Sequence, residues 1–134
     1  MIAIDTNVLV RVLINEPNET AQITAARALV ASAQNVFVSQ VVLVETVWVL
    51  ESAYQLPKAD VLKALDHLVA NAAFSLDEEA RCSAAVRLFH QSNADFADCL
   101  ILTTCRAQGL ELHTFDKRLS KLDGAERVLP KPAT

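Results

Sequence analysis

The sequence predicts an α/β domain of three layers, in which helices cover both faces of a central, mainly parallel sheet of about four or five strands. Short apolar stretches alternate along the chain with longer stretches of helical periodicity, which is typical of this class. Only two glycines and four prolines occur in 134 residues, too few for a many-turned β-sandwich. With 52% hydrophobic residues, we expect one domain over residues 1–134, with a tail from about residue 130.

The first half of the chain begins with a short apolar strand that ends at Asp5. Ser39 is placed to cap a helix that runs through Tyr54. Because nearly every residue from 41 to 50 is apolar, we expect this helix to be buried on most sides. The other expected elements are a strand at 2–4, helices at 8–14 and 19–33, and a strand at 35–38.

In the second half, Pro57 suits the first turn of a helix and Gly109 suits a left-handed residue just after one. The expected elements are helices at 57–69, 77–90 and 93–108, strands at 73–76 and 110–114, a short helix or turn at 116–122, and a fifth strand at 127–129.

Four carboxylates stand alone within the most apolar stretches, namely Asp5, Glu45, Asp98 and Asp116. A carboxylate among apolar side chains is normally paired with a cation, hydrogen-bonded or bound to a metal. If the four converge, Mg²⁺ or Mn²⁺ is the simplest counter-charge, because these ions prefer oxygen ligands. Asp95 is either a further, secondary ligand or the cap of its helix. Such a metal centre supports hydrolysis of phosphodiesters.

Each carboxylate also has a purely structural interpretation. Asp5 could cap the first helix, Asp98 could sit in the first turn of its helix, and Asp116 could pair with Lys117 or Arg118. Glu45 would need an ion pair across the core, for which the candidates are Arg11, Arg27 and Arg106. That all four are unrelated structural acids is much less plausible than any one of these explanations.

The net charge of the whole chain and the local distribution of its cations have different implications for nucleic-acid binding. A net charge of −4 argues against tight, non-specific DNA binding. Five cations nevertheless lie near the C-terminus, where they form either a phosphate-contacting rim or a solvated face: Lys117, Arg118, Lys121, Arg127 and Lys131. Among single residues, Arg11 is the best candidate for a phosphate contact, followed by Lys117.

The remaining chemistry-bearing residues are expected to pack rather than react. The three histidines share no spacing, so we expect them to be surface or packing residues. The three cysteines form no CxxC pair, so we expect them to be small buried hydrophobic residues. Trp48 and the phenylalanines are expected in the core rather than as base-stacking platforms, with Phe96 and Phe115 near the rim of the site. No apolar run approaches the length of a membrane span, and we expect a cytoplasmic protein.

Four segments together resemble the acidic motifs of PIN-domain ribonucleases, and their order and spacing are most similar to those of VapC toxins. They are Ile4–Arg11 (IDTNVLVR), Val38–Leu50 (VSQVVLVETVWVL), Asp95–Ile101 (DFADCLI) and Thr114–Asp116 (TFD). The resemblance extends to about Asp123. It departs at Cys99, where relatives often carry Ala.

The resemblance implies that Asp5, Glu45, Asp98 and Asp116 are catalytic and bind Mg²⁺ or Mn²⁺. It assigns hydrogen-bonding support to Thr6 or Asn7 and to Thr114. It also implies a three-layer α/β/α fold, cleavage of structured or single-stranded RNA, a homodimer and inhibition by a cognate antitoxin.

Two other functional hypotheses remain. The same fold could be a catalytically silent module that holds RNA or a protein partner. A phosphotransfer receiver or phosphatase with an Asp after the first strand is weaker, since the chain offers Asp5-Thr6-Asn7 rather than a second adjacent acid.

Overall fold

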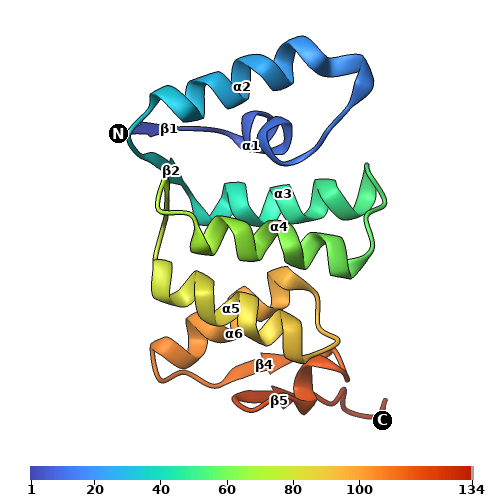
Figure 1. Ribbon diagram of the computed structural model, residues 1–134. Coiled ribbons are helices and arrows are strands. Elements are labelled where there is room, and N and C mark those ends of the chain that lie inside the picture. Colours follow the sequence, from blue (N-terminus) through green and yellow to red (C-terminus); the bar gives the residue numbers. More distant parts are fainter. Residues whose placement is uncertain (134) are drawn as a thin grey trace. The chain divides into compact units, whose positions relative to one another are not determined.

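A computed structural model describes residues 1–133 and is shown in Figure 1. The chain divides into two compact units, Met1–Cys82 and Ser83–Thr134, each of which is described here by itself. Helices and parallel strands alternate in both units, which confirms the α/β class. That the whole chain forms one domain stays a prediction.

The first unit is built on a three-stranded parallel sheet with the strand order β1-β2-β3. Its strands are β1 (Ile2–Ala3), β2 (Val36–Val38) and β3 (Phe74–Leu76). Val36 pairs with Ile2 on one side and with Phe74 on the other. Val36 and Val38 are buried while Phe37 between them is half-buried, as the alternation of a strand requires.

Four α-helices accompany this sheet, and Figure 1 shows α1 lying between α2 and α3. In chain order they are α1 (Thr6–Leu13), α2 (Thr20–Ser32), α3 (Gln40–Ser52) and α4 (Lys58–Ala70), with a 3₁₀ turn η1 (Pro17–Glu19) before α2. The predicted cap of α3 is confirmed, because the Ser39 hydroxyl accepts a hydrogen bond from the Val42 amide at 3.2 Å. Pro57 stands at the N-cap position of α4.

The second unit begins within α5 (Glu79–Gln91) and continues through α6 (Phe96–Ala107). Gly109 has φ +69° just after α6, so the predicted helix end is confirmed. The two-stranded parallel sheet of this unit pairs β4 (Leu112–Thr114) with β5 (Ala125–Arg127), and the 3₁₀ turn η2 (Leu119–Lys121) lies between them in the chain.

Three expectations about burial or register are wrong. On α3, Val41 and Trp48 are both 67% exposed and Glu45 is exposed, so one face of this helix is open in residues 1–133. Phe115 is likewise 70% exposed, whereas Phe96 is 1% exposed and belongs to the core as predicted. The fifth strand lies at 125–127 instead of 127–129 because Ala125, and not the exposed Leu129, faces the interior.

The cysteines are structural, as the sequence predicts. Cys82 and Cys99 are buried and Cys105 is half-buried, and no disulfide joins them. Burial raises the pKa of the Cys82 thiol to about 11, and the neighbouring Asp77 carboxylate adds to the effect. None of the helices in residues 1–133 has the length and apolar character that a membrane crossing needs.

Candidate functional site

Asp5 follows β1 and caps α1. Ile4 before it is 7% exposed, whereas Asp5 itself is exposed. Its Oδ1 accepts a hydrogen bond from the Val8 amide at 3.2 Å. The capping role is therefore real, and it uses one of the two carboxylate oxygens.

Glu45 lies in the middle of α3, on the exposed face of that helix. The arginines considered as its partners are engaged elsewhere: Arg11 with Gln22 and Tyr54, Arg27 with Val12 and Asn15, and Arg106 with Asp123. No ion pair to Glu45 occurs in residues 1–133. The structure therefore does not support an ion pair between Glu45 and any of these three arginines.

Asp98 lies in the first turn of α6 and is half-buried. Its pKa is raised above the ordinary value, mainly by burial and further by the negative charges of Asp95 and Asp116. Asp95 occupies the N-cap position of α6, but its side chain makes no capping hydrogen bond. Its predicted role as a secondary metal ligand stays a prediction.

Asp116 begins the turn that follows β4. Its Oδ1 accepts hydrogen bonds from the amides of Arg118 at 2.8 Å and Leu119 at 3.1 Å. The Asp116 amide in turn donates to the Thr114 hydroxyl at 3.0 Å. Asp116 is thus held by backbone amides, not by the side chains of Lys117 or Arg118.

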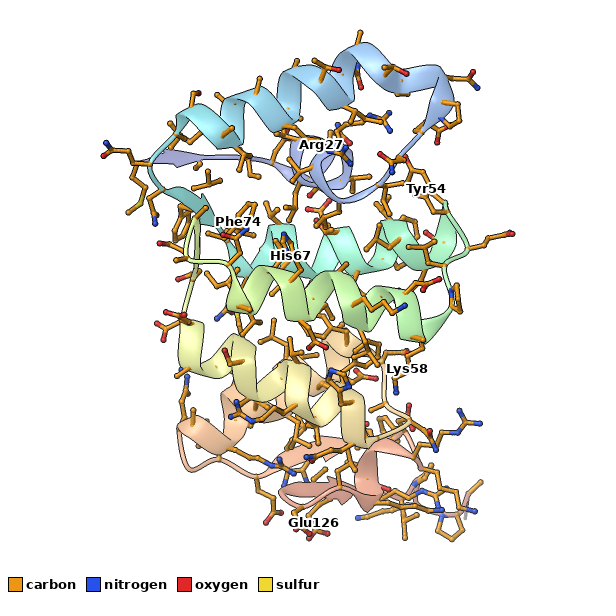
Figure 2. The ribbon with its side chains drawn as sticks, viewed as in Figure 1. Arg27, Tyr54, Lys58, His67, Phe74 and Glu126 are labelled. Carbon is orange, nitrogen blue, oxygen red and sulfur yellow. The ribbon has the colours of Figure 1, made fainter. Side chains whose placement is uncertain are left out.

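Arg11 links three segments of the first unit. Its Nε donates to Gln22 of α2 at 2.9 Å, and its Nη1 donates to the hydroxyl of Tyr54, just after α3, at 2.8 Å. Nη2 lies 3.8 Å from a carboxylate oxygen of Glu19. Figure 2 labels Tyr54 on the side of the unit where the chain passes from the end of α3 to the start of α4. The guanidinium is largely committed to these contacts, and its predicted phosphate contact stays a prediction.

A pocket of about 350 Å³ lies beside Asp5 in the first unit. Asp5, Asn7, Arg11 and Gln22 contribute its polar wall, and Leu29 contributes to the apolar part. Thr6 is half-buried and Asn7 is exposed, so of the two predicted supporting residues Asn7 is the one that shares this pocket with Asp5.

The structure groups some of the predicted acids. Within the second unit, the negative charges of Asp95 and Asp116 both act on Asp98 and raise its pKa. In residues 1–133, no three His, Cys, Asp or Glu side chains are arranged to hold a metal ion. The histidines form no cluster either: His67 contacts Asn71, and His113 contacts Glu111.

Two residues of the site region are not among the predicted site residues. In the sequence Tyr54 marks only the end of a helix, although a tyrosine at the end of an apolar helix has a polar tip that needs a partner. Gln22 carries no comparable signal, because one glutamine on a helix surface is ordinary.

The chain belongs to the PIN domain family, whose pattern matches residues 2–125. The resemblance drawn from the four motifs is thereby confirmed. Among curated proteins, the chain is 26% identical over 129 residues to a VapC ribonuclease from Aquifex aeolicus (strain VF5), with 95% of each chain covered.

Proposed function

We propose that this protein is a metal-dependent endoribonuclease, which hydrolyses RNA phosphodiester bonds and serves as the toxin of a toxin–antitoxin pair. Its family and its similarity to a VapC ribonuclease support this function. The observation that carries the proposal concerns Asp5 and Asp116. Each follows a parallel strand by two residues. The Oδ1 of Asp5 accepts a hydrogen bond from one backbone amide and that of Asp116 from two, and no other hydrogen bond in residues 1–133 uses either carboxylate.

The proposed metal ligands are Asp5, Glu45, Asp98 and Asp116, with Asp95 in a secondary role. This donor set consists only of carboxylate oxygens, which fits Mg²⁺ or Mn²⁺ better than a softer metal. The crowding of negative charge around Asp98 is a further sign that a cation suits this region. When bound, the ion would activate water and stabilise the leaving oxygen of the phosphodiester.

The chain's own residues would orient the carboxylates. Backbone amides fix one oxygen of Asp5 and one of Asp116, so neither side chain must be ordered when the ion arrives. Thr114 restrains the backbone at Asp116, and Asn7 flanks Asp5. Arg11 and Lys117 are the proposed contacts to RNA phosphates.

The proposal includes the partners that the family resemblance implies. These are RNA as the substrate, a cognate antitoxin protein as the inhibitor, and a second copy of this chain in a homodimer. The proposed location is the cytoplasm.

The test replaces Asp5 or Asp98 with asparagine. Asparagine caps helices about as well as aspartate, so Asp5→Asn should retain the fold while losing a charged ligand. We expect RNA cleavage in Mg²⁺ to fall by at least about 100-fold, beyond the range typical of residues that only support a metal ligand. Glu126→Gln is the matched control, because Glu126 is an exposed acid of β5 (Figure 2) outside the four motifs.

The outcomes separate the two leading hypotheses. Undiminished cleavage by both Asp variants would contradict the assigned chemistry. If the wild-type protein binds RNA or a protein partner but cleaves no RNA in Mg²⁺ or Mn²⁺, the catalytically silent module is the correct description.

A further inference from the structure

Arg11 lies where two pockets of the first unit meet. One is the pocket of about 350 Å³ beside Asp5, here called the Asp5 pocket. The other, of about the same volume, is called the Tyr54 pocket, and its lining residues include Glu16 and Tyr54. Asn7 and Arg11 line both pockets. Because these two residues are four positions apart on α1, they share one face of that helix, and this face separates the pockets.

Arg11 is the only lysine or arginine that lines either pocket within residues 1–133. Carboxylates lie on both sides of it, since Asp5 lines one pocket and Glu16 lines the other. A phosphate that reaches this face of α1 therefore finds one positively charged side chain, at the boundary between the pockets. A guanidinium suits this task because its planar set of N–H donors matches phosphate oxygens.

Two side chains fix the direction of this guanidinium. Its Nε donates to the side-chain oxygen of Gln22 at 2.9 Å, and its Nη1 donates to the Tyr54 hydroxyl at 2.8 Å. Nη2 makes no hydrogen bond within residues 1–133, and its ion pair with Glu19 spans 3.8 Å between side chains that are 22% and 39% exposed. An ion pair so close to solvent contributes little, so Nη2 can exchange Glu19 for a phosphate while Gln22 and Tyr54 hold the group in place.

We propose that an RNA strand crosses this face of α1 with one nucleotide in the Asp5 pocket and the next in the Tyr54 pocket, and that Arg11 contacts the phosphate between them. Tyr54 and Gln22 act through Arg11 and are positioning residues. The inference rests on the proposed ribonuclease function and adds a second nucleotide pocket to its substrate site. A guanidinium that is already oriented loses less entropy on binding, so its two partners strengthen RNA binding without changing the cleavage step.

The experiment measures kcat and KM for cleavage in Mg²⁺ of an RNA of about ten nucleotides, which is long enough to span both pockets. The variants are Tyr54→Phe, which removes only the hydroxyl, Gln22→Met, Arg11→Gln, and Tyr54→Phe combined with Arg11→Gln. Ser75→Ala is the matched control. The Ser75 hydroxyl donates to the Asn35 side chain at 2.6 Å, which is a tertiary hydrogen bond of the same unit between residues that line neither pocket.

We expect Tyr54→Phe and Gln22→Met each to raise KM about 2- to 12-fold, the equivalent of one net hydrogen bond, with kcat unchanged. In the Arg11→Gln background, Tyr54→Phe should raise KM no further, because its effect passes through the guanidinium. Arg11→Gln should also lower the salt dependence of RNA binding by about one phosphate contact. Ser75→Ala should lower the melting temperature but leave KM at the wild-type value.

A second substitution tests whether the Tyr54 pocket holds a nucleotide. Ala53 lines this pocket and is exposed, so Ala53→Phe fills the pocket without disturbing the core. We expect KM to rise at least about fivefold, the lower end of what a base held against an aromatic side chain contributes. Ala59→Phe is the control, because Ala59 is an exposed alanine of α4 that lines neither pocket, and it should leave KM unchanged.

An unchanged KM in Tyr54→Phe and Gln22→Met would overturn the inference, as would an unchanged KM in Ala53→Phe. An equal effect of Tyr54→Phe with and without Arg11 would also overturn it, because Tyr54 would then act on RNA independently. A fall in kcat at constant KM would assign these hydrogen bonds to the cleavage step instead.

Failure of the wild-type protein to cleave RNA would contradict the proposed function, and binding then decides the inference separately. The same variants are compared by their dissociation constants for the RNA in EDTA. Weaker binding by Tyr54→Phe only where Arg11 is present supports the inference, whereas equal dissociation constants for all variants overturn it.

Discussion

At the scale of single residues, two proposed ligands use only one of their carboxylate oxygens in hydrogen bonds within residues 1–133. Asp5 and Asp116 are each fixed through Oδ1 by backbone amides, which satisfies the donors at the start of a helical turn. Thr46, directly after Glu45, is the opposite case, because its hydroxyl is buried and has no hydrogen-bond partner within residues 1–133. An unsatisfied buried hydroxyl costs free energy that a methyl group would not.

Replacing Thr46 with valine should therefore stabilise the fold. We expect the free energy of unfolding to rise by about 1 kcal/mol, the lower end of the penalty for an unsatisfied buried polar group. Urea denaturation followed by circular dichroism measures it. Thr103→Val is the matched control: Thr103 is 6% exposed, but its hydroxyl donates to the Leu100 carbonyl at 3.1 Å, so this variant should be no more stable than the parent. A loss of stability in Thr46→Val would show that its hydroxyl is satisfied.

The sequence alone singles out the proposed site residues because each acid interrupts an apolar stretch, which is a local property of the sequence, and their role at a metal site stays a prediction. How these side chains are held could not. The sequence left open whether Asp116 pairs with Lys117 or Arg118, and the answer depends on a turn that brings two amides to its carboxylate. In the same way, the sequence singles out Arg11 as a candidate phosphate contact. It does not predict the hydrogen bond from Arg11 to Tyr54, because Tyr54 lies 43 positions away in the chain.

At the scale of helices and strands, one guanidinium joins α1 to α2 and to the end of α3. Arg11 donates to both Gln22 and Tyr54, and Arg27 of α2 (Figure 2) donates to the Val12 carbonyl of α1 at 3.3 Å. Since Asp5 begins α1 and Glu45 lies on α3, these bonds help to fix the two helices that carry proposed ligands.

A double-mutant cycle with Tyr54→Phe and Arg11→Gln measures the strength of this link. Tyr54→Phe removes only the hydroxyl, so we expect a loss of about 1–2 kcal/mol in the free energy of unfolding, as for hydrogen bonds to charged groups. The double variant should lose less than the sum of the single variants by about 1 kcal/mol, since the two groups contact each other. Strict additivity in chemical denaturation would show that this bond does not form in solution.

Helix and strand positions were predictable within a few residues, but exposure was not. The apolar composition of α3 suggested burial on most sides, yet Val41 and Trp48 share an exposed face with Glu45. When a helix has few polar residues, hydrophobicity alone does not indicate which of its faces is buried and which is exposed. The position of β5 at 125–127 also differs from the predicted 127–129, because pairing of Ala125 with Leu112 is a tertiary contact that the sequence pattern does not encode.

At the scale of the whole molecule, the chain carries a net charge of −4, and its proposed metal ligands are all carboxylates. A cation that binds only the folded state stabilises that state by mass action.

The α/β class and its parallel strands follow from the order of apolar stretches, whereas the division of five strands into a three-stranded and a two-stranded sheet does not.

Addition of Mn²⁺ should raise the melting temperature of the wild-type protein. At a concentration about 100 times the dissociation constant, the expected stabilisation is about 2.7 kcal/mol, which corresponds to a shift of several degrees. The Asp5→Asn, Asp98→Asn double variant should show a much smaller shift, and EDTA should reverse the effect in the wild type. An equal rise in both proteins by thermal denaturation would mean that Mn²⁺ binds elsewhere.

The open face of α3 has a practical consequence. Trp48 is the only tryptophan of the chain, and it is 67% exposed in residues 1–133. Its indole emission already comes from a hydrated environment in the folded protein, so it should change little on unfolding. The same emission should shift to shorter wavelength when a partner covers α3, which makes Trp48 a built-in reporter of assembly.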